Sequence, residues 1–260
     1  MARIGVIVWA QHTIQSGMWF EALIVCSALA GGAIAGVTGF GIGSLLTPAL
    51  AWQIDARTAV AAVSIPHFLG TAFRFWLLGG RVDRRVLWSF GLMSAAGGLT
   101  GALLQQRSTT PALMLIFGAL LLFSAGAELT GFARRMQFEG PFAWVAGATS
   151  GFLGGLVGNQ GGVRSAALLG VDLPKHAFVA TATAVALMVD AARVPVYLWY
   201  LNGQLMPLAG LIILATAGVL AGTFVGHRLL QTIPERWFRR TVAIILALLG
   251  ATMVIRGLIR

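Results

Sequence analysis

Eight long apolar stretches, separated by short polar loops, make up most of this 260-residue chain. A helix needs about 20 apolar residues to cross lipid, so six stretches suit one crossing each and two are too long. Only 10% of the residues are charged, whereas a soluble domain has roughly 25%. With no alternating strand pattern either, the chain is predicted to be an all-α polytopic membrane protein. The stretches cover residues 18–52, 56–79, 86–106, 111–133, 141–171, 175–201, 205–229 and 236–257.

The two stretches that are too long for one span contain matching glycine clusters. Residues 31–43 read GGAIAGVTGFGIG and residues 150–162 read SGFLGGLVGNQGG, and four glycines coincide at an offset of 119 residues. Glycine is common in this chain, so a single match means little, but four in one register indicate an internal repeat. Such repeats are typical of transporters.

The same offset of 119 places Arg74 on Arg193, and each lies far from the ends of its apolar stretch. The sequence therefore predicts one transmembrane domain made of two repeats, residues 1–135 and 136–260. Toward the end of each repeat the offset drifts to 121, where Gly97 and Gly101 match Gly218 and Gly222.

Arginine clusters in alternate loops predict the orientation of the repeats. The positive-inside rule places these loops in the cytoplasm and the uncharged loop near Asn202 outside. Two apolar stretches separate Arg135 from Asn202, so one of them must enter and leave on the same side, and the glycine-broken stretch 141–171 is the natural candidate. The clusters are Arg81, Arg84 and Arg85; Arg134 and Arg135; and Arg228, Arg236, Arg239 and Arg240.

Applied to both halves, this reasoning gives two inverted repeats, each a Gly-broken re-entrant helix pair plus three transmembrane helices. Arg256 and Arg260 then lie outside, against the rule. If each broken stretch crosses the membrane once, the repeats are parallel instead. The sequence also leaves open whether the chain acts alone or as a homodimer.

The helix breaks predict an anion site between the repeats. A break in mid-membrane frees backbone groups that need protein or a water-filled cavity around them. The N-terminus of the following half-helix offers N–H groups and a partial positive charge to an oxyanion. The alternative is that the glycines only permit close helix packing. The expected site residues at the breaks are Gly39, Gly41, Gly43, Gly158, Asn159, Gln160, Gly161 and Gly162.

Ionisable residues within the apolar stretches are further candidates, since burying them in lipid is costly. Arg74 and Arg193 are expected to flank one anion, although Asp190, three residues before Arg193, makes an internal ion pair a rival interpretation. Asp190 is also a candidate for proton coupling. Arg164 either reaches the site or extends to an interface. His67 shares a helix face with Arg74 and binds the anion or a proton, or is a satisfied core histidine.

Several function classes are excluded by the sequence. The net charge of +10 would suggest nucleic acid in a soluble protein, but here the arginines lie between apolar segments, as the positive-inside rule explains. No metal-ligand spacing, phosphate-binding loop or nucleophile elbow is present, so we expect no metal, no cofactor and no enzyme activity.

The glycine-rich segments resemble a known family. GGAIAGVTGFGIGSLLTPAL (31–50) and SGFLGGLVGNQGGVRSAALLG (150–170) resemble the paired signatures of the TauE/SafE sulfite exporter family. The resemblance implies a secondary transporter of the bacterial inner membrane that exports small sulfur-containing anions such as sulfite, thiosulfate or sulfoacetate-like organosulfonates. Alternating access between the halves would move the anion; a passive anion channel is the alternative.

The predicted orientation can be tested by thiol labelling, because Cys26 is the one cysteine of the chain. In a Cys26→Ala background, Asn202→Cys is expected to react with a membrane-impermeant maleimide added to intact spheroplasts. Arg84→Cys is expected to react only in inverted vesicles. Labelling of both positions from the same side would contradict the arrangement.

Overall fold

The computed structural model describes residues 18–132, 141–159, 173–229 and 235–259, together with Gly161, Arg164 and Leu168. Every element in these residues is helical, which confirms the all-α class. The first half contains α2 (Met18–Thr38), α3 (Ile42–Leu50), α4 (Ala56–Leu78), η1 (Gly79–Arg81), α5 (Arg84–Val86), η2 (Leu87–Gly91), α6 (Leu92–Gln105) and α7 (Thr110–Leu129). The second half contains α8 (Pro141–Val157), α10 (Lys175–Leu205), η4 (Met206–Leu208), α11 (Ala209–Leu229) and α12 (Glu235–Ile259).

Six stretches of the described chain are long and apolar enough to cross a membrane. One of them, Ala177–Arg228, has 52 residues and includes most of α10 and α11. A straight helix of that length would measure about 78 Å, far more than the roughly 30 Å of a hydrocarbon core. The chain therefore turns back at η4, between the two helices.

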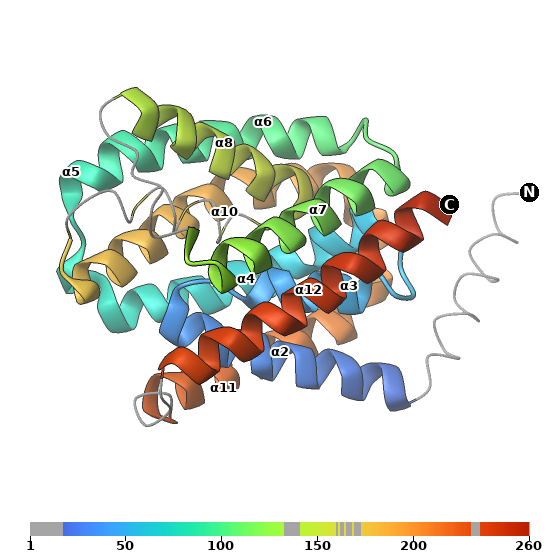
Figure 1. Cartoon of the computed structure of the whole chain (residues 1–260). Coiled ribbons are helices and arrows are strands. Elements are labelled where there is room, and N and C mark those ends of the chain that lie inside the picture. The colour runs from blue at the N-terminus through green and yellow to red at the C-terminus, as the bar shows by residue number, and fades with distance from the viewer. Residues whose placement is uncertain are drawn as a thin grey trace, which may run out of the picture.

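The helices form four principal pairs. Helix α6 packs on α8, α2 on α11, α7 on α12, and α4 on α10. Figure 1 shows α6 and α8 along one edge of the bundle and α2 and α11 along the opposite edge, with α4 and α10 between them. Two of the pairs, α2–α11 and α6–α8, join the first described helix of one half to a later helix of the other half. The halves are thus interlocked rather than merely side by side.

Glycine permits the very close approach within these pairs. A Cβ atom added to Gly151 of α8 would lie 1.9 Å from the carbonyl oxygen of Ser94 in α6. At the equivalent position in the other half, a Cβ on Gly32 would lie 2.4 Å from the carbonyl oxygen of Val219 in α11. Direct backbone contact of this kind is how membrane helices gain packing energy without a hydrophobic driving force.

These contacts also align the two halves more accurately than the sequence did. Gly97 faces the carbonyl of Ala148, and Gly222 faces that of Leu29, which lies 119 residues before Ala148. Gly97 is therefore equivalent to Gly222 and not to Gly218, one helical turn away. Because glycine recurs every four residues in both helices, the sequence match could slip by one turn without losing its glycines.

The C-terminal helix α12 holds the far end of α3. Arg256 donates from Nη1 to the carbonyl oxygen of Ala51 and from Nη2 to that of Trp52, both at 3.0 Å. Its guanidinium also lies over the Trp52 ring, 5.0 Å from the centroid. These contacts give Arg256, the apparent exception to the positive-inside pattern, a structural partner on the side where α3 ends.

The close contact at Gly151 predicts a marked loss of stability in Gly151→Ala. An added methyl group would meet backbone atoms that cannot rotate away, which should lower the free energy of unfolding by about 1–3 kcal/mol. Thermal unfolding in detergent would measure the change. Gly126→Ala in α7 is the matched control, because a Cβ there meets nothing within 4 Å. Equal melting temperatures for the two variants would contradict the packing.

Candidate anion site between two helix breaks

One left-handed glycine ends α2 and another ends α8. Gly39 follows α2 with φ 83°, and Gly158 follows α8 with φ 77°. Each closes its helix in the same way, since the N–H of Gly39 donates to Ala35 and that of Gly158 donates to Gly154, both at 3.0 Å. Glycine takes this conformation without steric cost, so it stops a helix at a defined residue. The break predicted within 18–52 is confirmed at this point.

The two breaks lie against each other. A Cβ on Gly43, in the first turn of α3, would lie 2.4 Å from the carbonyl oxygen of Gly158. The Ser44 hydroxyl donates to Oδ1 of Asn159 at 3.3 Å. Every residue of α3 is buried. The N-terminus of α3 is therefore held inside the protein, directly beside the second break.

Arg74 binds the end of the first broken helix. It lies one turn before the end of α4 and is 3% exposed. Its Nη1 donates to the carbonyl oxygen of Ala35 at 2.6 Å, and Nη2 donates to that of Gly39 at 3.1 Å. Its Nε donates to the Thr183 hydroxyl of α10 at 2.9 Å. The guanidinium thus satisfies freed carbonyls at the negative end of α2.

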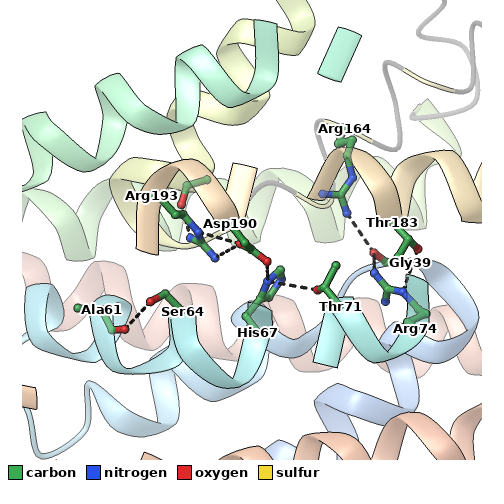
Figure 2. Close-up of polar contacts among 11 residues, drawn as sticks. Gly39, Ala61, Ser64, His67, Thr71, Arg74, Arg164, Thr183, Asp190 and Arg193 are labelled. Carbon is green, nitrogen blue, oxygen red and sulfur yellow. Dashed lines mark hydrogen bonds and ion pairs between the residues drawn. The ribbon is translucent and has the colours of Figure 1, made fainter. Parts of the chain in front are cut away.

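Arg164 approaches the same carbonyl from the other half. It is 1% exposed, and its Nη2 donates to the Gly39 carbonyl oxygen at 3.0 Å. Figure 2 shows Arg74 and Arg164 converging on Gly39 from opposite sides. Within the described residues, Nε and Nη1 of Arg164 are buried without a hydrogen-bond partner. Arg164 is therefore buried beside the first break.

The charges of these two arginines are not balanced by a contacting carboxylate in the described part of the chain. Their hydrogen-bond partners are carbonyl oxygens and one hydroxyl. Buried charges in proteins are normally paired. Two like charges that share one carbonyl oxygen, with two N–H donors left over, form a site that an anion would complete.

Arg193 has a different environment. Its Nε and Nη2 donate to Oδ1 of Asp190 at 2.9 and 2.8 Å, and its Nη1 donates to the carbonyl oxygen of Gly154. Oδ2 of Asp190 lies 2.6 Å from Nδ1 of His67 on α4. Asp190 and Arg193 are 0% and 1% exposed. The internal ion pair that the sequence offered as the rival interpretation is the geometry found.

Arg74 and Arg193 are equivalent in their backbone contacts but not in their charge partners. Ala35 and Gly154, the carbonyls that they bind, are also 119 residues apart. In the first half the position of Asp190 is occupied by Thr71. Two helix ends are therefore capped by arginine, and within the described residues only Arg193 of these two contacts a carboxylate.

The remaining expected residues lie close to these groups where the structure describes them. Gly41, with φ 139°, precedes α3, and a Cβ on Gly161 would overlap the Phe40 side chain at the first break. Gln160 and Gly162 lie outside the described residues. In the described chain no group of three or more His, Cys, Asp or Glu could hold a metal ion.

Sequence patterns did not indicate Thr71 or Tyr197. Thr71 lies at the repeat equivalent of Asp190, and Tyr197 lies one turn after Arg193, where its hydroxyl donates to the carbonyl oxygen of Gly155. The offset of 119 would have indicated Thr71, had it been applied to every ionisable residue. Tyr197 carries no signal of its own in the sequence.

Asp190→Ala is expected to destabilise the protein strongly, because it leaves the Arg193 charge buried without a carboxylate. Removal of one partner of a buried ion pair costs about 3–5 kcal/mol. Thermal unfolding in detergent would detect the loss. Asp190→Leu combined with Arg193→Met should recover part of it, since the unpaired charge at position 193 is then removed, although the Gly154 carbonyl loses its donor. A double variant as unstable as Asp190→Ala would contradict the pairing.

The family comparison covers both breaks and all three buried arginines. The model of the family described as sulfite exporter TauE/SafE matches residues 23–253. Comparisons with curated proteins and with solved structures gave no match. The match confirms the resemblance drawn from the two glycine-rich segments. The chain belongs to the TauE/SafE sulfite exporter family, a family of membrane transporters.

Proposed function

We propose that the protein is a secondary transporter that exports a small sulfur oxyanion, sulfite or an organosulfonate of the sulfoacetate type, across a bacterial inner membrane. Family membership supports anion export through a membrane. The choice among sulfur anions rests on the family together with the form of the site.

The observation that carries the proposal is the convergence of Arg74 and Arg164 on the Gly39 carbonyl oxygen. Two donors of Arg164, Nε and Nη1, have no partner in the described residues and lie on different edges of the guanidinium. A charged N–H donor of this kind forms a strong hydrogen bond to an oxygen of an oxyanion. Sulfite and sulfonate both present three oxygens on one sulfur, so one can contact the arginine while the others contact further donors.

The N-terminus of α3 is the natural third contact. It begins at Ile42, three residues after Gly39, and Gly41 supplies no capping side chain. The first turn of a helix presents N–H groups and a partial positive charge toward an anion. All of these groups lie inside the bundle, where water screens the attraction least.

The site lies between the two halves, which suits alternating access. Arg74 belongs to residues 1–135 but binds Thr183, and Arg164 belongs to residues 136–260 but binds Gly39. In our proposal the halves are inverted repeats, and the glycine-broken segments enter and leave on one side. A shift of one half against the other would then change which side of the membrane reaches the arginines.

Transport by proteoliposomes tests the proposal. The purified protein is expected to move at least one of sulfite, thiosulfate, sulfoacetate and taurine, and to move sulfate less well. Arg164→Gln should reduce the rate about tenfold or more, because hydrogen bonds to charged groups contribute about 1.5–3 kcal/mol each. Arg228→Gln is the matched control, since Arg228 is exposed and its guanidinium lies over Phe224 at the end of α11.

Four outcomes bear on the proposal. Saturable flux that is accelerated by anion on the opposite side supports a carrier. Unsaturable flux without such counterflow would instead identify a passive anion channel. Failure to bind or move any of the five anions would overturn the substrate class, and an Arg164→Gln variant with wild-type flux would remove Arg164 from the site.

A further inference from the structure

One polar pair near the proposed anion site has no counterpart at the equivalent positions of the two halves. His67 and Asp190 bond each other across the halves, from α4 to α10. Their repeat equivalents are Ala186 and Thr71, so the first half has no carboxylate and the second half no imidazole at these positions. Helix ends capped by arginine are built into both halves, as Arg74 and Arg193 show. An arginine can therefore cap a broken helix without a His67–Asp190 pair beside it. The presence of this pair calls for a different explanation.

Asp190 is held as an ionised carboxylate. Oδ1 accepts from both Nε and Nη2 of Arg193, and Oδ2 faces Nδ1 of His67. Three N–H groups directed at two carboxylate oxygens favour the charged form. A proton that binds this cluster therefore goes to the imidazole, while Asp190 positions the ring.

Of the two ring nitrogens of His67, Nδ1 is hydrogen-bonded and Nε2 is available to bind a proton. Within the described residues, His67 makes its hydrogen bonds through Nδ1, to Asp190 and Thr71. When Nδ1–H donates to the carboxylate, Nε2 of the neutral ring is an acceptor that can bind a proton. The His67 side chain is 10% exposed, whereas that of Asp190 is 0% exposed. The exchange of a proton is thus possible at His67 and blocked at Asp190.

The free edge of the ring faces the proposed anion site. A Cβ on Gly43, beside the second break, would lie 3.9 Å from Cδ2 of His67, the atom bonded to Nε2. Figure 2 shows His67 between the Asp190–Arg193 pair on one side and the two arginines at Gly39 on the other. A proton on Nε2 and an anion at the breaks would consequently occupy neighbouring positions.

The charges around His67 make the two binding events dependent on each other. The groups that face it are Asp190 and Arg193 of α10, with Arg74 on its own helix and Arg164 beyond the second break; α3 has no ionisable residue. Without an anion, a proton on His67 would add a fourth positive charge against one carboxylate. An anion between Arg74 and Arg164 offsets that repulsion. By linkage, the proton then strengthens anion binding by the same factor.

We propose that the protein carries one proton together with each anion, and that Nε2 of His67 is the proton-binding atom. The N–H bond forms with a proton from the aqueous phase on the side where the anion is loaded. It breaks on the side where the anion leaves, so the ring returns neutral. This inference rests on the proposed anion transport.

Proton uptake on binding is the first test. Sulfoacetate, whose charges do not change near neutral pH, is added to detergent-purified protein in weak buffer, and the pH is followed. Wild-type protein is expected to take up close to one proton per anion bound, and His67→Gln none. Ser64→Ala is the matched control, since Ser64 lies one turn before His67 on α4 and its hydroxyl donates to the Ala61 carbonyl.

Flux in proteoliposomes is the second test. His67→Gln should lose net sulfoacetate movement driven by a pH gradient by at least tenfold, yet retain exchange of anion for anion within about threefold. Proton-linked flux in His67→Gln equal to wild type, or wild-type binding without proton uptake, would overturn the assignment and leave the transporter proposal intact. If wild-type protein binds and moves none of the sulfur anions, the proposed function itself is wrong. The measurement of proton uptake by wild-type protein tests proton coupling even if His67→Gln fails to fold.

Discussion

A helix that ends in the interior of a helical bundle leaves carbonyl oxygens without partners in the helix, and the rest of this structure depends on how they are satisfied. In lipid, each unsatisfied backbone group costs several kcal/mol. Here the carbonyls at the ends of α2 and α8 accept from the guanidinium groups of Arg74 and Arg193. Each arginine therefore has a structural task before it has a functional one, which explains why both lie deep in apolar helices.

The two halves solve this problem alike and then differ in charge. Asp190 balances Arg193, whereas Arg74 shares the Gly39 carbonyl with Arg164. The arginine charge at the end of α8 is thus neutralised by a carboxylate. The arginines at the end of α2 retain their positive charge and have unused donors within the described residues. In the proposed transporter, this difference between two similar helix ends would leave one of them available to bind the anion.

Hydropathy predicted the helices well because lipid imposes their length; the apolar stretch 56–79, for example, corresponds to α4, Ala56–Leu78. The break at Gly39 was predictable because glycine is needed where a helix ends in the left-handed region. The shared carbonyl was not, because it joins residues 125 apart whose meeting depends on how each helix is rotated. The same holds for His67 and Asp190, which lie on different helices and show no common sequence pattern.

The contact between Arg256 and the carbonyls of Ala51 and Trp52 has a consequence for biogenesis. The half-helix α3, whose N-terminus lies at the first break, is anchored at its other end by the last helix of the chain. During synthesis α3 leaves the ribosome long before α12 exists. The first break can therefore gain this anchor only after α12 has been inserted, and a chain that stops before α12 would leave α3 without it.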